Sequence, residues 1–129
     1  ILQNSQIRRK WKDMNELNNE RQKNDKYMIR TLDIIEYLKP KYYFIENPRY
    51  SKIWDIEQTK KYDFVLVDYC RFGFEYKKPT KILTNKKIEN VICQCNQKHK
   101  IRVGGTDYGW NGPEIRYRIP QQLIEYLLN

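Results

Sequence analysis

The chain has 129 residues, which is enough for one domain and too short for two. Its 25 basic and 16 acidic residues give a formal net charge of +9, which favours a polyanionic partner such as nucleic acid. A solvated, lysine-rich surface is the alternative interpretation of this charge. No run of about 18 apolar residues occurs, so we expect no membrane-spanning segment. Three cysteines without a secretion signal indicate a reduced, intracellular compartment.

The first 18 residues are polar and basic, with the run RRKWK at residues 8–12. We expect this segment to be a leader, either a loop or a loosely packed helix. A solvated, mobile leader is one interpretation. A basic arm that follows a nucleic-acid strand, with Trp11 as an aromatic contact, is the other.

A helix is predicted over residues 19–38, because apolar side chains recur there at spacings of three and four. Those side chains are Met28, Leu32, Ile35 and Leu38. Pro40 ends the helix, since the residue before a proline is driven out of the helical region. The nearly continuous apolar run 41–45 then predicts a short strand, of the kind found in sheets that are covered on both faces.

Two further strands are predicted at residues 62–69 and 81–84, with a bend at Gly73 between them. The link is too short for a helical crossover, so these two strands should be antiparallel neighbours. A less regular strand is expected at 88–95 and a long loop at 96–115. Between the first two strands, residues 49–54 should form a short helix or an ordered loop.

A closing helix is predicted over residues 119–128, with Pro120 in its first turn. Its apolar face would contain Leu123, Ile124, Leu127 and Leu128. Because helices and strands are interleaved along the chain, the predicted fold class is α/β in a single domain over residues 1–129.

The first predicted strand runs into Glu46, Asn47 and Pro48. In an open α/β sheet, ligands bind at the carboxyl ends of the strands. Asn47 offers both donors and an acceptor, and Glu46 accepts hydrogen bonds or donates one when protonated, so the pair has the chemistry to read the edge of a nucleotide base. A carboxylate that caps the helix after Pro48 is the alternative. We place Pro48 and the adjacent Arg49 at the same nucleic-acid interface.

Basic side chains lie around the expected bend between the second and third strands. Arg71, Lys77 and Lys78 are close to it, with Thr80 just beyond. Such an arrangement suits a clamp on the phosphate backbone, which positions a nucleic acid without reading its sequence. A surface hairpin with solvated lysines is the alternative.

Cys93, Cys95 and His99 follow one another with the spacing C-x-C-x₃-H. Three such ligands, with Cys70 as a further candidate, have the chemistry to hold Zn²⁺. However, the spacing is not the usual C-x₂-C pair, and no second pair exists. We therefore expect no metal, and interpret these residues as packed thiols and a polar loop histidine.

Three blocks of the sequence, in this order, resemble phage- and giant-virus-type DNA cytosine methyltransferases. They are residues 30–48 (RTLDIIEYLKPKYYFIENP), residues 67–85 (with VDYCRFGF and KKPTKILTN) and residues 116–124 (RYRIPQQLI). The resemblance implies an S-adenosyl-L-methionine-dependent enzyme, with a partial Rossmann-like methyltransferase sheet and an antiparallel hairpin at its edge. It further implies that Glu46 contacts the target cytosine near N3 and the exocyclic amine, and that Asn47 supports this loop.

Members of this family carry a glycine-rich cofactor loop and a Pro-Cys nucleophile motif before the helix that matches residues 19–38. Neither occurs here, and the first residue is Ile1, which suggests a fragment or a processed product. We expect the target-base and DNA-backbone-binding half of a viral enzyme, in the cytoplasm or nucleus of the host cell. S-adenosyl-L-methionine would be bound mainly by a complementary N-terminal half or partner chain. The alternative is a non-catalytic nucleic-acid-binding or structural module derived from a methyltransferase fold.

Overall fold

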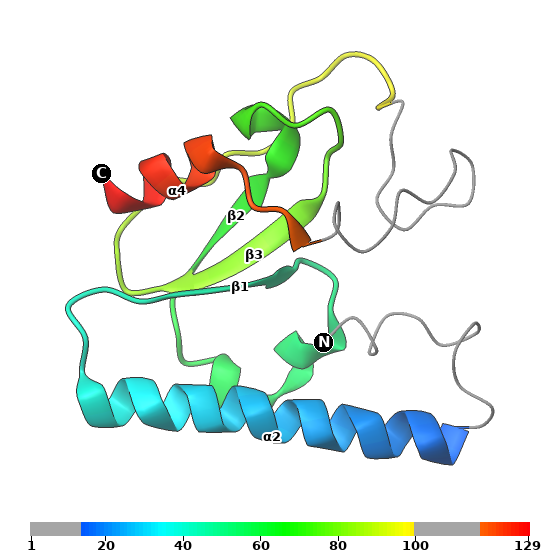
Figure 1. Cartoon of the computed structure of the whole chain (residues 1–129), viewed down its shortest axis with the longest axis vertical. Helices are drawn as coiled ribbons and strands as arrows, with labels where there is room; N and C mark the ends of the chain where they lie inside the picture. Colours follow the sequence, from blue (N-terminus) through cyan, green and yellow to red (C-terminus); the bar gives the residue numbers. More distant parts are fainter. Residues whose placement is uncertain (1–13, 100–116) are drawn as a thin grey trace.

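A computed structural model describes residues 14–99 and 117–129. A sheet lies between two helices, and short 3-10 helices follow the first two strands (Figure 1). The main elements are α2 (Met14–Leu38), β1 (Phe44–Pro48), β2 (Phe64–Asp68), β3 (Pro79–Thr84) and α4 (Gln121–Leu128). The 3-10 helices are η2 (Lys52–Asp55), η3 (Glu57–Thr59) and η4 (Tyr69–Phe72).

The described strands form one sheet in the order β1-β3-β2, with β3 antiparallel to both neighbours. The predicted antiparallel pairing of the second and third strands is therefore confirmed. Because β1 and β2 run in the same direction, their carboxyl ends lie at the same edge of the sheet, beside the start of β3. The β2–β3 hairpin forms one end of this sheet. A larger, Rossmann-like sheet goes beyond these three strands and stays a prediction.

The sheet is covered on both faces, as predicted from the nearly continuous apolar run at residues 41–45. Consecutive residues of a strand point to opposite faces, and Ile82 and Leu83 of β3 accordingly enter two different cores. Ile82 packs in the core beneath α4, which contains Val65, Val67, Tyr69, Phe72, Tyr76, Ile82, Leu123 and Leu127. Leu83 packs in the core next to α2, which contains Met28, Leu32, Ile53, Ile56 and Leu83.

The first helix ends where Pro40 predicts, but it begins at Met14, five residues before the predicted start. Leu17 is fully buried, and its burial favours a helix that reaches further into the polar segment than side-chain spacing alone indicates. Residues 14–18 of the expected leader are thus helical, and the rest of the leader lies outside the described residues. Within the described ranges, no helix combines the length and apolar character needed to cross a membrane.

Three other expectations need correction. The strand predicted at 41–45 is shifted to Phe44–Pro48, so the Glu-Asn-Pro sequence lies within β1. The strand expected at 88–95 is reduced to one parallel bridge between Val91 and Val67. In α4, Leu123 and Leu127 are buried one turn apart, whereas Ile124 and Leu128 lie on the exposed side. The predicted loop 96–115 falls mostly outside the described residues.

The end of α2 is tied to the segment before β2. The Tyr62 hydroxyl donates a 2.7 Å hydrogen bond to Glu36 Oε1, and Lys61 forms an ion pair with the same oxygen at 3.4 Å. These contacts lower the pKa of Glu36, with the Tyr62 hydrogen bond as the largest cause. Burial, followed by the hydrogen bond to Glu36, raises the pKa of Tyr62 to about 12.

We expect Tyr62→Phe to raise the pKa of Glu36 toward its ordinary value of 4.5. In the parent, the lowered pKa of Glu36 stabilises the fold above pH 4.5, and this contribution is lost as the pH falls through the folded-state value. The raised pKa of Tyr62 stabilises the fold below pH 10, and its contribution is lost as the pH rises toward about 12. Both pH-dependent contributions should shrink in the variant.

An NMR titration of Glu36 and urea unfolding at acid, neutral and alkaline pH measure these changes. Tyr37→Phe is the matched control, because Tyr37 is 87% exposed on the same helix. An unchanged Glu36 titration in Tyr62→Phe would contradict the expected coupling.

Candidate functional site

The predicted base and backbone contacts come together at the edge where β1 and β2 end. Pro48 pairs with Thr80, and Asp68 pairs with Pro79 in the sheet register. The Arg49 amide donates to the Pro79 carbonyl at 3.0 Å, which continues the β1–β3 contact beyond the strand. The hairpin bend after β2 therefore lies beside the carboxyl end of β1, as the candidate site requires.

Glu46 and Asn47 lie on opposite faces of the sheet. Glu46 pairs with Ile82, whose side chain belongs to the core beneath α4. Asn47 pairs with Lys81 and is buried on the other face, with only 3% of its surface exposed. The prediction that the two side chains read one base together is therefore wrong, since successive strand residues cannot share a face.

A carboxylate, a phenol and an amine gather on the α4 face of this edge. Glu46 Oε1 is buried and makes no hydrogen bond among the described residues, and the buried hydroxyl of Tyr69 likewise has no partner there. Lys78 Nζ lies over the Tyr69 ring, 4.7 Å from its centroid. These three polar groups thus share a small volume, and two of their buried oxygen atoms, Glu46 Oε1 and the Tyr69 hydroxyl, lack the hydrogen bond that normally satisfies a buried atom.

The electrostatics of this group reflect its burial. Burial raises the pKa of Tyr69 well above its ordinary value, and the negative charge of Glu46 adds to the rise. Burial lowers the pKa of Lys78, while the charge of Glu46 opposes that change. Perturbed titration of neighbouring groups is typical of functional sites, although structural ion pairs also produce it.

The bend itself holds Lys78 in an unusual backbone conformation. Its φ is +34°, in the left-handed region that non-glycine residues seldom occupy. The Thr80 hydroxyl donates to the Lys78 carbonyl at 3.0 Å, and Thr80 is fully buried. Strained backbone of this kind is found more often at functional sites than elsewhere.

Arg49 is engaged in an ion pair with Asp68, which ends β2. The two side chains approach to 2.8 Å, and the Asp68 side chain is fully buried. Arg49 also donates to the Val67 carbonyl at 3.1 Å. The other Asp68 oxygen accepts a 2.7 Å hydrogen bond from the amide of Cys93. Arg49 therefore joins β1 to β2, and its assignment to a DNA backbone stays a prediction.

The other residues predicted to contact the DNA backbone differ in how far the protein already occupies their side chains. Arg71 lies in η4 and donates to the Ile92 carbonyl at 2.9 Å, so part of its guanidinium is already occupied. Lys77 is exposed, and its carbonyl accepts from the Tyr69 amide. Sequence reasoning left Asp68 and Tyr69 out of the site. The signal that could have included them is their position at the carboxyl end of a buried strand, where Asp68 is the last residue of β2 and Tyr69 follows it.

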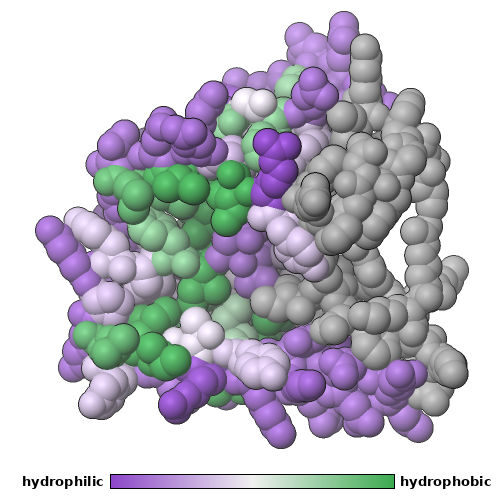
Figure 2. Space-filling model, viewed as in Figure 1, coloured by the Kyte–Doolittle hydropathy of each residue, from purple (hydrophilic) through white to green (hydrophobic). Residues whose placement is uncertain are grey.

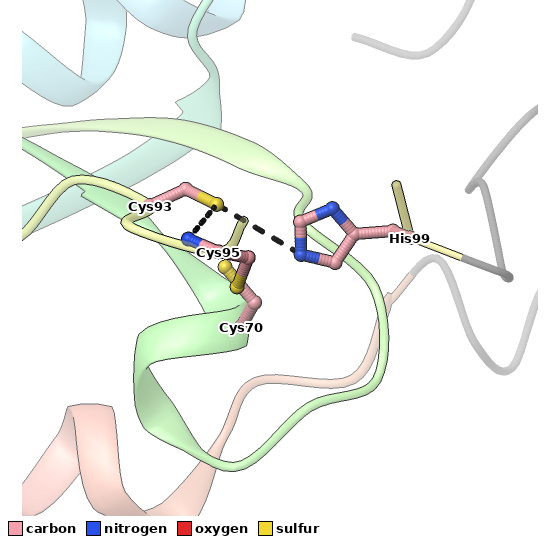
Figure 3. Close-up of side chains that lie close together, drawn as sticks. All are labelled: Cys70, Cys93, Cys95 and His99. Atoms are coloured by element: carbon pink, nitrogen blue, oxygen red, sulfur yellow. Dashed lines mark hydrogen bonds between the residues drawn. The ribbon is translucent and has the colours of Figure 1, made fainter. Parts of the chain in front are cut away.

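The structure brings the candidate metal ligands together more closely than the sequence indicates. Cys70 of η4 lies next to Cys93, Cys95 and His99, and the potential ligand atoms all lie within 4.8 Å of one another (Figure 3). All three thiols are free. Burial and the neighbouring cysteines raise the pKa of Cys70 to about 12. The amide of Cys95 lowers the pKa of Cys93.

The fold and this edge define a mixed α/β region with a small antiparallel sheet and polar groups where its parallel strands end. Comparison with curated proteins finds a probable DNA (cytosine-5)-methyltransferase of Frog virus 3 (isolate Goorha), 29% identical over 120 residues. The match covers 78% of this chain and 54% of the relative, so the chain spans about half the length of that protein. The chain thus contains a viral cytosine-methyltransferase-like region. No protein-family model matches it, and no solved structure does.

The described residues do not themselves fit a site for S-adenosyl-L-methionine. Gly73 is the only glycine among them, and it ends η4 instead of opening a helix after a strand. Asp68, the acidic residue at the carboxyl end of β2, has both oxygens occupied by Arg49 and Cys93. Among the described residues there is thus no glycine-rich loop of the kind that binds a nucleoside cofactor, and the carboxylate at the end of β2 is not free to bind one.

Proposed function

We propose that the chain is the target-base and DNA-backbone-binding half of an S-adenosyl-L-methionine-dependent DNA cytosine methyltransferase. The observation that carries this proposal is the buried, unpartnered Oε1 of Glu46, which occupies the position of the glutamate in the Glu-Asn-Pro motif. Leaving such a group unsatisfied costs about 1–3 kcal/mol. A ligand that donates to this oxygen would recover that free energy.

Cytosine has the matching chemistry. Its exocyclic amine donates a hydrogen bond, and its N3 is an acceptor that becomes a donor on protonation. Glu46 would accept from the amine and hold or protonate N3, beside the Tyr69 hydroxyl and the Lys78 ammonium. Asn47, on the opposite face, would act as a positioning residue that fixes β1.

The basic residues around the bend would contact the DNA backbone. Lys77 is exposed for this role, Arg71 lies in η4 earlier in the same connection, and Lys78 is held by its strained backbone at the bend. Arg49, Pro48 and Thr80 would shape the edge, because their own contacts already fix them to neighbouring strands. Phosphate contacts of this kind position a duplex and make its binding salt-dependent.

The two outer strands of the sheet differ in whether their outer edge is paired, and this difference supports a complementary half. The far side of β2 is covered by residues 90–91, through the Val67–Val91 bridge and the bond from the Leu66 amide to Asn90. In the described part of the chain, β1 pairs with β3 alone. An unpaired strand edge is a template for further pairing. A segment carrying the cofactor loop and nucleophile would extend the sheet here.

Exposed apolar side chains on the two helices also favour a complementary half. Figure 2 shows apolar surface over α4 and over the end of α2, with more between them across the middle of the molecule, whereas most of α2 is hydrophilic. Ile124 and Leu128 of α4, and Ile34 and Leu38 of α2, are all more than 40% exposed. Covering these side chains would add hydrophobic stabilisation to strand pairing.

Binding to duplexes that differ at one cytosine tests the base-holding role. A cytosine in a mismatch leaves the stack at lower cost than a paired one. We expect the chain to bind the mismatched duplex at least about tenfold more tightly, since unpairing costs a few kcal/mol. Glu46→Gln should abolish that preference while the salt dependence of binding stays the same.

Glu57→Gln is the matched control, because Glu57 is an exposed carboxylate in η3 that pairs with Lys60 at the surface. It should retain the mismatch preference. A non-catalytic nucleic-acid-binding module predicts instead that Glu46→Gln leaves binding to every duplex unchanged. That result would contradict the base-holding role and favour the alternative.

A further inference from the structure

Four zinc-type ligands converge from two separate parts of the chain. Cys70 comes from η4, directly after β2, while Cys93, Cys95 and His99 come from the segment that follows the Val91 bridge. Figure 3 shows the three thiols and the imidazole turned toward one another. The convergence depends on the fold, because Cys70 is far from the other three in sequence.

The spacing of these atoms is close to that of a tetrahedral metal site. Zinc binds sulfur at about 2.3 Å and imidazole nitrogen at about 2.0 Å, so two ligand atoms of one ion lie roughly 3.5–3.8 Å apart. Cys93 Sγ and His99 Nε2 are 3.9 Å apart, and no two of the four potential ligand atoms are more than 4.8 Å apart. Small side-chain rotations would bring all four atoms onto one ion.

The backbone around the cluster is arranged for a thiolate. The Cys95 amide donates to Cys93 Sγ at 3.4 Å, an N–H···S contact that orients a sulfur ligand. The Cys93 amide is itself fixed by the buried carboxylate of Asp68 at 2.7 Å. The sulfur of Cys93 is thus oriented by the backbone amide of Cys95, and its main chain is fixed by Asp68, which is not a ligand, as outer partners hold the ligands of metal sites.

We propose that Cys70, Cys93, Cys95 and His99 bind one Zn²⁺ ion in a structural site. Four protein ligands close the coordination shell, which distinguishes a structural zinc from a catalytic one with an open position. The ion would clip residues 92–99, which form no helix or strand, onto η4. Because η4 is bonded to the bend through the Tyr69 amide and the Lys77 carbonyl, the clip would also stiffen the edge that carries Lys77.

Metal analysis of the full 129-residue chain, purified under reducing conditions from zinc-containing medium, is the first test. We expect one zinc per chain. Replacement by Co²⁺ should give the visible absorption of a tetrahedral ion together with sulfur-to-cobalt charge transfer. A chain without bound zinc, or a cobalt spectrum typical of six oxygen and nitrogen ligands, would overturn the proposal.

Variants separate coordination from general damage to the loop. Cys93→Ser and His99→Ala should weaken Zn²⁺ binding by more than the roughly 10–100-fold that loss of an outer partner costs. His99→Cys should retain one zinc as a Cys₄ site, with stronger charge transfer in the cobalt form. Gln94→Ala, an exposed neighbour between two ligands, should leave metal content unchanged. Unchanged affinity in Cys93→Ser would overturn the site.

A chemical readout remains informative if one of these variants folds poorly. In the parent chain, stoichiometric Zn²⁺ should protect Cys70, Cys93 and Cys95 together from alkylation, and chelation should expose them together. Protection of all three at a single metal equivalent is the result expected for shared coordination. Equal alkylation with and without Zn²⁺ would show that the cluster is a set of packed thiols.

Discussion

Asp68→Ala is expected to lower the free energy of unfolding by about 3 kcal/mol, the scale found when one partner of a buried ion pair is removed. The Asp68 side chain is fully buried. It forms an ion pair with Arg49 at 2.8 Å and accepts a hydrogen bond from the Cys93 amide at 2.7 Å. Its loss leaves a largely buried guanidinium and a backbone amide without their partner. Urea unfolding monitored by circular dichroism measures the change.

Asp55→Ala supplies the matched control for this experiment. Asp55 pairs with Lys52 at 3.8 Å, and both side chains are more than 60% exposed. Such surface pairs contribute less than about 1 kcal/mol. Asp68→Asn keeps an oxygen acceptor but removes the charge. Its loss of unfolding free energy should lie between those of Asp68→Ala and Asp55→Ala. Equal destabilisation by Asp68→Ala and Asp55→Ala would contradict the structural role of the Arg49–Asp68 pair.

Methyl transfer is the second large effect that we expect. The chain alone should transfer no labelled methyl groups to DNA. A fusion to the part of the Frog virus 3 relative outside the matched region should supply the cofactor loop and nucleophile, and so restore transfer. Within that fusion, Glu46→Gln should lower the rate by about 10²–10⁴-fold, the range for loss of a positioned acid or base.

The fusion with Glu57→Gln should transfer methyl groups at close to the parental rate, because that carboxylate lies on the surface in η3. Transfer by residues 1–129 alone would contradict the assignment of this chain to one half of the enzyme. Full activity in the Glu46→Gln fusion would contradict the role of Glu46 while leaving the split between the halves intact.

The sequence predicted which helices and strands form better than it predicted the residues at which they begin and end. Pro40 marks the end of α2 because its effect on the preceding residue is local. The end of β1 is set by pairing with β3, more than 30 residues later, and no local pattern reveals that Glu46 and Pro48 stay in register with Ile82 and Thr80. As a result, the opposite orientations of Glu46 and Asn47 could not be derived from the sequence.

The candidate metal ligands illustrate the same limit. The C-x-C-x₃-H spacing is visible in the sequence, but the fourth ligand is supplied by tertiary structure. The Val67–Val91 bridge brings the segment with Cys93 beside the end of β2, where Cys70 follows. A single bridge of this kind leaves no periodic pattern, so spacing alone favoured packed thiols over a site with four converging ligands.

The central place of β3 determines the order in which the sheet can assemble. In the innermost pair of each strand pair, Asp68 and Pro79 are 11 positions apart, whereas Pro48 and Thr80 are 32 positions apart. The hairpin of β2 and β3 therefore closes the shorter loop. β1 can pair only after β3 has been made, on the side of β3 that β2 does not use. Of the three described strands, β1 and β2 leave the ribosome before β3, the strand with which both of them pair. Until residue 84 has emerged, the apolar residues of β2 and those at the start of β1 lack the full length of β3 as a pairing partner.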